Sequence, residues 1–493
     1  MPQLQNPEFL ETRSIPRLLF QFSTPAITAS LVTATYNLVA RVFVAKRFDL
    51  DGVAALTVSF PTIVVFLAVA MMIGTGATIL ISIRLGERNN AKAEEALGQA
   101  LFLSAATAAI FILLGSLFLE PILRFSGATD DILPMAKSYL SVVIWGVFTQ
   151  HIAFGVNNFV RAEGKPRIAM VSMILSAVVN GLLDYVFLFV FKTGIWGAGL
   201  ANVIACAVAA AWIIWLYFSD RTILKWRWKY FRFNGPLAWK IAVSGAVPFA
   251  AQACSVVLQV TQNNLLGKYG LLYGEAMNYP AALDGGVVAI GIMGTAVAVA
   301  NMFLMPFLGL GQGVQPIVGY NVGAKRPDRT LATIKTALKV ALVISGIFWA
   351  VVMAKPQWFV EWFLSRGEEG FGEKYALGIV AIRAVMCALP LVAVNILTSG
   401  YFQAQNRAVL ALMMTLLRQL IFLLPLLTIM TALFERFWGA GKGLNGCWFA
   451  FPIADALACL VSVVFLALDF AAKKRDVARM NAERGEESVL LAG

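Results

Sequence analysis

The sequence has 493 residues, of which 59% are hydrophobic and only 13% are charged, whereas a soluble protein carries roughly 25% charged residues. Its formal net charge of +12 is scattered over short segments instead of gathering on one surface, which argues against nucleic-acid binding. Apolar stretches of about 18 residues or more recur from end to end, and each can cross a bilayer as a helix. We therefore expect an all-α polytopic membrane protein.

The apolar runs predict twelve transmembrane helices in two sets of six. The first set covers 17–44, 53–83, 97–119, 138–160, 168–191 and 195–218, and the second covers 240–266, 285–317, 337–354, 376–403, 409–433 and 444–470. A basic connector separates the sets. We expect a first lobe at 1–218, a cytoplasmic connector at 219–239, a second lobe at 240–470 and a charged cytoplasmic tail at 471–493.

The basic residues predict the orientation. Twelve spans place about 24 of the 39 basic residues on the side of both termini, against about 11 on the other side. Because short cytoplasmic loops are rich in Lys and Arg, we expect both termini of this multi-pass protein in the cytoplasm. The first dozen residues are polar and the first apolar run is long enough to stay as a span, so we expect no cleaved signal peptide.

The two halves resemble each other. An offset of 237 aligns "GTGATILISIRLGERNNAKA", which begins at Gly74, with "GQGVQPIVGYNVGAKRPDRT", which begins at Gly311. A second match sets "FVRAEGKPR" (159–167) against "YFQAQNRAV" (401–409), and Pro25 and Pro248 each lie early in the first span of a half. Repeated halves are typical of transporters in which one lobe rocks against the other around a midplane site.

One acid stands out in the fifth span, "VVNGLLDYVFLFV". Asn180 and Asp184 are four residues apart, so both side chains leave the same face of a helix. An ionised carboxylate near the centre of a membrane helix costs about 2.5–3.5 kcal/mol on insertion scales, so a retained acid is a functional candidate. The alternative is a neutral or paired Asp184 that only hydrogen-bonds a neighbouring helix.

Other polar residues lie in later spans. Arg418 and Asp455 are both mid-helix, and a buried ion pair would hold both charges in lipid; ligand or proton handling in the second lobe is the alternative. A stripe at helical spacing in the seventh span could line a wet cavity or join helices, and the same two roles are open for Asn157. The stripe consists of Gln252, Gln259 and Asn263.

Several chemistries are missing from the sequence. There is no G-x-x-x-x-G-K-[ST] loop and no cytosolic domain large enough to hydrolyse ATP, so we expect neither an enzyme with catalytic residues nor a cofactor. The five cysteines have no spacing for a disulfide or a zinc site. Active transport must therefore draw on an ion gradient, in which one elementary charge crossing about 100 mV yields roughly 2.3 kcal/mol.

At the level of motifs, the sequence resembles the multidrug and toxic compound extrusion (MATE) family, on its bacterial branch. The resemblance rests on residues 157–170, 178–191, 194–205 and 305–329. It implies twelve helices in two lobes that form a V, and export of amphipathic, often cationic drugs or toxic metabolites in exchange for protons or sodium. It also implies a location in the cytoplasmic (inner) membrane of a bacterial cell.

Carried over by motif, Asn180 and Asp184 match the ion-coupling pair of the family's first lobe, where either a proton or a sodium ion would bind. Asn202 falls where that site often has a Thr. The sequence departs from the family at Ala40, where the family usually has an Asp. This leaves open whether the coupling ion differs, the stoichiometry falls or the second lobe takes over.

We expect occupation of this site to bend the first lobe at a hinge near Pro25 and to expel substrate from a chamber between the lobes. The chamber would be lined by Met293, Met302, Met305 and Gln259. We expect small amphipathic substrates, contact with membrane lipid and a monomer. The alternatives are a lipid-linked oligosaccharide flippase of the same superfamily and a non-transporting membrane sensor or scaffold, while the G-x-x-x-D-R-x-G-R loop of major facilitator carriers is missing.

Overall fold

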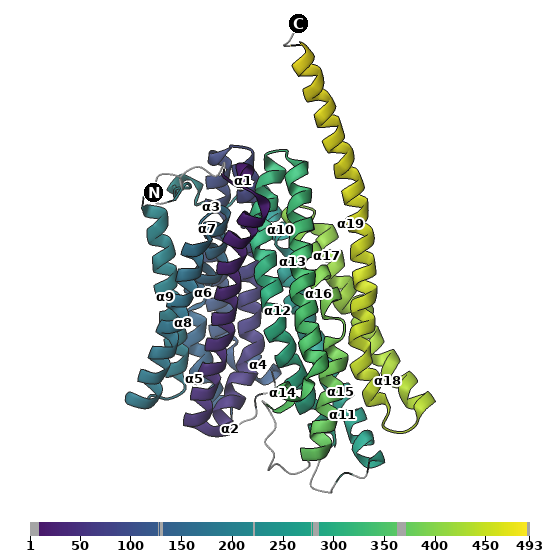
Figure 1. The fold of residues 1–493 in the computed structure, drawn as a ribbon. Helices are drawn as coiled ribbons and strands as arrows, with labels where there is room; N and C mark the ends of the chain where they lie inside the picture. Colours follow the sequence, from purple (N-terminus) through teal and green to yellow (C-terminus); the bar gives the residue numbers. More distant parts are fainter. Residues whose placement is uncertain are drawn as a thin grey trace. The chain divides into compact units, whose positions relative to one another are not determined.

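The computed structural model describes residues 9–126, 128, 132–219, 222–277, 279, 285–361 and 371–490. Over these residues every regular element is a helix (Figure 1), which confirms the predicted all-α class. The first part of the chain contains α1 (Phe9–Thr12), α2 (Ile15–Gly86), α3 (Asn90–Leu117), α4 (Leu119–Phe125), α5 (Leu133–Trp145), α6 (Val147–His151), η2 (Ile152–Val156), α7 (Asn157–Ala162), α8 (Pro166–Tyr185), η3 (Val186–Val190), α9 (Trp196–Phe218) and η4 (Trp228–Tyr230). The second part contains α10 (Gly235–Ser244), α11 (Ala246–Ala276), α12 (Gly285–Gly323), α13 (Pro327–Ala354), α14 (Pro356–Glu361), α15 (Phe371–Met386), α16 (Leu389–Ala404), α17 (Ala408–Leu416), η5 (Leu417–Leu423), α18 (Leu424–Trp438) and α19 (Gly443–Leu490).

Nine helices in the described residues are long and apolar enough to cross a membrane, and eleven if each of two bent pairs counts as one span. The bends lie between α5 and the α6–α7 stretch (59°) and between α10 and α11 (55°). The candidate spans expose apolar side chains. In Ala408–Trp438, for example, only 17% of the most apolar window is buried inside the protein. Such surfaces require lipid as the surrounding solvent.

The predicted spans 17–44 and 53–83 are joined by helix, because α2 includes 45–52. The chain nevertheless reverses direction within α2, because a Cβ on Gly313 would contact Ser23 and a Cβ on Gly323 would contact Ile83, whereas a straight helix would separate Ser23 from Ile83 by about 90 Å. The two predicted spans therefore remain. The predicted tail at 471–493 continues α19 as far as Leu490. The predicted first span, 17–44, is helical, although several of its side chains lie outside the described residues, as do 1–8 and 491–493.

The helices form two compact units. Unit 1 comprises 1–252, 309–333 and 401–409, and unit 2 comprises 253–308, 334–400 and 410–493. Unit 1 therefore includes three segments of the second sequence half: 240–252, 309–333 at the turn from α12 to α13, and 401–409 at the end of α16. The predicted lobes, with their border at 219–239, divide the chain differently and stay a prediction.

The backbone of unit 1 follows the predicted repeat. Arg88 and Lys325, which the offset of 237 aligns, have positive φ values of 56° and 53°. In the second match, Gly164 and Asn406 occupy the same position of their motifs and have φ values of 83° and 60°. Non-glycine residues rarely adopt this left-handed region. The two halves therefore turn in the same way at both repeated corners.

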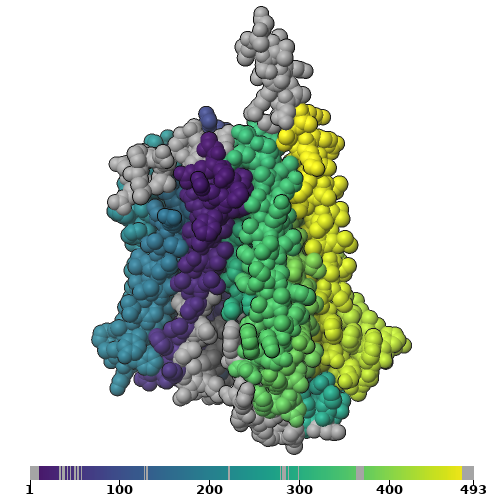
Figure 2. Space-filling view, viewed as in Figure 1, coloured from purple at the N-terminus to yellow at the C-terminus, as the bar shows by residue number. Residues whose placement is uncertain are grey.

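The repeat also explains how the ends of α2 and α12 pack within unit 1. A Cβ on Gly86 would contact the backbone of Tyr320 and Ala324, and a Cβ on Gly323 would contact the backbone of Ile83 and Glu87. The same offset aligns Ile83 with Tyr320, so the contact is reciprocal, as at a two-fold interface. Figure 2 shows the surface of α1 and the start of α2, in purple, against the green surface of the α12–α13 corner. We call the end of unit 1 that contains α1, Gly86 and Gly323 the α1 end of unit 1.

Candidate functional site

Asp184 and Asn180 lie together inside unit 1, 2% and 3% exposed, on the face of α8 that meets α9. With the Asn180 amide oriented to satisfy both of its groups, Nδ2 donates to Asp184 Oδ2 (3.2 Å) and Oδ1 accepts from the backbone N of Asn202 (3.1 Å). Asn202 therefore contributes its backbone, while its side chain is half-buried. The three residues named from the sequence are brought together.

The second carboxyl oxygen of Asp184 has no partner. Oδ1 is buried and makes no hydrogen bond, and no basic side chain among the described residues forms an ion pair with Asp184. Three other buried acids have a cationic partner: Glu94 pairs with Arg227, Asp455 with Arg418 and Asp469 with Lys473. Because a buried polar atom normally has a partner, Oδ1 is a candidate binding position for a small cation or a proton.

The helix changes its winding directly after Asp184. Residues Val186–Val190 form the π-helix η3, and Arg47 on α2 donates from Nε to Leu188 O within it (3.3 Å). Two more π-helical stretches border polar residues named from the sequence: η2 precedes Asn157, and η5 contains Arg418. Such stretches loosen the backbone and occur frequently at functional sites.

A second polar group of unit 1 lies near the α1 end. Asn157 is buried, accepts from Ser172 Oγ (2.9 Å) and donates to Ala169 O (3.3 Å), so it joins α7 to α8. Arg161, 5% exposed, donates to Gln312 Oε1 and to Asn158 Oδ1 (3.2 Å). Arg161 lies in the repeated stretch "FVRAEGKPR" (159–167), and nothing in the sequence indicates that its side chain is buried.

Sequence reasoning also missed Glu163, which lies in the turn between α7 and α8, outside the spans. Its side chain is fully buried, and Oε2 accepts from the backbone N of Ile223 (2.9 Å). Burial raises the pKa of Glu163 to about 7, because the loss of water outweighs the backbone hydrogen bonds and nearby Lys165. Its only sequence signal was its place in the "RAEGKPR" motif.

In unit 2, Arg418 donates from Nε to Asp455 Oδ1 (2.7 Å). This is the contact that the structural interpretation of the pair expects; a role in ligand or proton handling stays a prediction. Pro25 is buried in α2, which continues through it, and its hinge role stays a prediction.

The predicted chamber residues differ in exposure. Met293 is 1% exposed and Met302 45% exposed. Gln259 is exposed, and three others are half-buried: Gln252, Asn263 and Met305. Gln252 belongs to unit 1 and the other five residues belong to unit 2. That these six residues line a chamber between the lobes stays a prediction.

Comparisons with known proteins agree with this fold. The MatE family model matches residues 25–186 and 271–429. The multidrug export protein MepA of Staphylococcus aureus (strain MSSA476) is 23% identical over 466 residues, covering 93% of this chain and 95% of MepA, and MepA of Staphylococcus saprophyticus matches with the same figures.

Solved structures give the same fold. An outward-facing multidrug resistance MATE family transporter of the MOP superfamily has a TM-score of 0.84 and 21% identity, covering 94% of this chain and 98% of its own. A MATE structure in the straight conformation has a TM-score of 0.85 and 20% identity, covering 96% and 99%. As the sequence resemblance predicted, the chain belongs to the MATE family of multidrug transporters.

Proposed function

We propose that the protein is a secondary active antiporter that exports small amphipathic organic cations in exchange for protons. The observation that carries this proposal is Asp184, a buried carboxyl inside a span with one unpartnered oxygen and no ion-pair partner among the described residues. The names of the relatives, multidrug export proteins, support small organic substrates. They give no support to an oligosaccharide flippase.

A proton suits this site better than sodium. A proton needs only one oxygen, whereas hard metal cations take several oxygen ligands. Protonation also removes the cost of an ionised carboxyl in lipid surroundings, so the occupied and empty states differ in free energy.

The stoichiometry follows from the single acid. Ala40 stands where the family resemblance implies a second carboxyl, so we propose one proton per transport cycle. Exchange of one proton for one monovalent cation moves no net charge. A pH step of one unit then supplies about 1.4 kcal/mol, or a tenfold concentration ratio, and a membrane potential alone supplies nothing.

We place the α1 end of unit 1 in the cytoplasm of a bacterial cell, with the protein in its inner membrane. The bias of basic residues toward the predicted loops of this side supports the orientation, and the bacterial relatives support the location.

The test uses the purified protein in vesicles loaded with a fluorescent monovalent cation. We expect a pH step to drive its transport, and a potassium diffusion potential without a pH step to leave it unchanged. Asp184→Asn should abolish the pH-driven component. Glu120→Gln, which removes an acid paired with Lys137 and Arg124 on the surface, is the charge-matched control and should transport normally.

Two results would overturn the proposal. Normal pH-driven transport by Asp184→Asn would show that Asp184 does not bind the coupling ion. Transport driven by a sodium step, with no response to pH, would make sodium the coupling ion.

A further inference from the structure

Unit 1 contains a cavity of about 280 Å³ at its α1 end, between the end of α2, the start of α3 and α10. We call it the cationic cavity, because Arg84, Lys92 and Lys240 line it together with a single carboxylate, Glu95. Arg84 is paired with Glu87 (2.7 Å). Lys92 and Lys240 are exposed and make no ion pair with any described residue, so the cavity carries an excess of positive charge.

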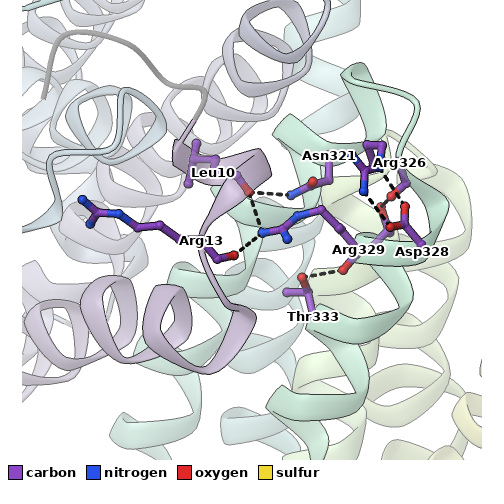
Figure 3. A network of polar contacts seen from close by, with 8 residues as sticks. Leu10, Arg13, Asn321, Arg326, Asp328, Arg329 and Thr333 are labelled. Atoms are coloured by element: carbon purple, nitrogen blue, oxygen red, sulfur yellow. Dashed lines mark hydrogen bonds and ion pairs between the residues drawn. The ribbon is translucent and has the colours of Figure 1, made fainter. Parts of the chain in front are cut away.

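In the second half of the repeat, the position that corresponds to this cavity is occupied by the chain around α1. The offset of 237 carries Arg84 and Lys92 onto Asn321 and Arg329 of the α12–α13 corner. Figure 3 shows that corner: Arg329 donates from Nη2 to Leu10 O (3.1 Å) and to Arg13 O (2.5 Å). Asn321 Nδ2 also donates to Leu10 O (3.4 Å). The donors of the second corner therefore bind the carbonyl oxygens of the chain around α1.

The first corner, which is the turn from α2 to α3, lacks equivalent carbonyl oxygens. The offset between Pro25 and Pro248 makes residues 233–236 the counterpart of 10–13. Here α3 holds this segment instead: Asn234 donates from its backbone N to Gln99 Oε1 (3.0 Å) and from Nδ2 to Glu95 Oε1 (3.2 Å). Among the described residues Lys92 makes no hydrogen bond to this segment, and Lys92 and Lys240 line the cavity.

The residues around the cavity include exposed aromatic side chains of the kind found at a membrane interface. Trp239 is 72% exposed and Phe233 66% exposed, and aromatic side chains gather at the level of lipid headgroups. A second cavity of about 300 Å³ is almost entirely apolar and shares α2, α3 and α10 with the first. It meets the opposite face of α10, since Ala238, Trp239 and Ala242 line it whereas Pro236, Leu237 and Lys240 line the cationic cavity.

The apolar cavity begins beside Phe233 and Trp239 and extends deeper into the spans along α2 and α3. On α2, Ile73 lies about three turns from Arg84, and on α3, Leu103 lies about three turns from Lys92. Both steps lead away from the turn between α2 and α3, toward the middle of the membrane. A charged cavity next to the loops is thus followed by an apolar one toward the middle of the membrane. This order matches the order of groups in a phospholipid.

We propose that the cationic cavity binds the phosphate headgroup of an anionic membrane lipid, with an acyl chain passing α10 to lie along the apolar cavity. The volume is at the small end of ligand pockets, which start at about 300 Å³, so it suits a headgroup and not a drug. Basic pockets between helices on the cytoplasmic side are known to accept such headgroups. The site is separate from Asp184 and does not depend on the transport mechanism.

The test measures binding of phosphatidylglycerol to the delipidated full-length protein by native mass spectrometry, with phosphatidylcholine as the neutral lipid. Each cation near the surface contributes about 1 kcal/mol to binding an anionic lipid, or about fivefold. We therefore expect the variant Lys92→Gln/Lys240→Gln to bind phosphatidylglycerol about 25-fold more weakly and phosphatidylcholine unchanged. Lys92→Arg/Lys240→Arg should bind like the wild type, which also shows that the corner folds normally after substitution.

The matched control is Lys229→Gln/Arg232→Gln. It removes two exposed charges from the connector, outside the cavity, and should keep phosphatidylglycerol binding within about twofold. An equal loss in this control would reduce the effect to general surface charge and overturn the proposal. Equal binding of phosphatidylglycerol and phosphatidylcholine to the wild type would overturn it as well. Full competition by millimolar inorganic phosphate would instead assign the cavity to a soluble anion and exclude the lipid.

Discussion

Glu163→Gln perturbs a buried acid that the proposed transport cycle does not use. The side chain is 0% exposed in the turn between α7 and α8, and burial raises the pKa of Glu163 from 4.5 to about 7. A glutamine has nearly the same shape and keeps an oxygen that can accept from the backbone N of Ile223. The substitution therefore removes the titration and leaves the hydrogen bond in place.

The sign of the effect follows from the direction of the pKa shift. An acid whose pKa is higher in the folded than in the unfolded state stabilises the fold only while it is protonated. This contribution is fully present below pH 4.5, declines between pH 4.5 and 7, and is lost above pH 7. The change from 4.5 to about 7 corresponds to about 3 kcal/mol at 1.36 kcal/mol per unit.

The measurement is thermal unfolding in detergent between pH 4.5 and 8. Relative to Glu163→Gln, the wild type should lose about 3 kcal/mol of its free energy of unfolding as the pH rises, so the variant is the more stable protein at pH 8 and equal at pH 4.5. Glu120→Gln, which removes an acid whose pKa is lowered by Lys137 and Arg124, should leave the decline between pH 5 and 7 intact. Parallel curves for the wild type and Glu163→Gln would refute the reasoning.

Three further substitutions test other parts of the structure. Gly323→Leu would force a side chain into the backbone of Ile83 and should lower the unfolding midpoint sharply, whereas Gly311→Ala, which meets nothing within 4 Å, should not. Arg418→Met should cost about 3 kcal/mol of the free energy of unfolding, because it leaves Asp455 buried without a cation; an equal cost in an Asp455→Leu background would show that the pair is not coupled. Ala40→Asp should make vesicle transport respond to membrane potential by adding a second acid, and an unchanged response would place residue 40 outside the coupling site.

The sequence predicted the features that are encoded locally. Apolar runs predicted the helices, and the spacing of Asn180 and Asp184 predicted that both would lie on one face of α8. The aligned turns at Arg88 and Lys325 were also predictable, because the same short motif produces the same left-handed turn in both halves. Local hydrogen bonds determine these features, so a window of residues contains the needed information.

Burial by distant segments could not be predicted in the same way. Arg161 and Glu163 look like ordinary loop charges, and their burial depends on Gln312 and Ile223, which are 151 and 60 residues away. The link at 45–52 between the first two spans is helical where charged residues suggested a loop, because a helix satisfies its backbone internally while exposed side chains such as Lys46 stay solvated.

The two halves keep one backbone plan but differ in their charges, and this difference argues for coupling through one half only. Asp455 forms an ion pair with Arg418, whose side chain is 24% exposed. Asp184 has a neutral neighbour, Asn180, and an unpartnered oxygen, so a proton bound there would break no ion pair. This difference supports the proposal that coupling uses Asp184. The π-helix η3, which begins two residues after Asp184, is the nearest segment whose winding could respond.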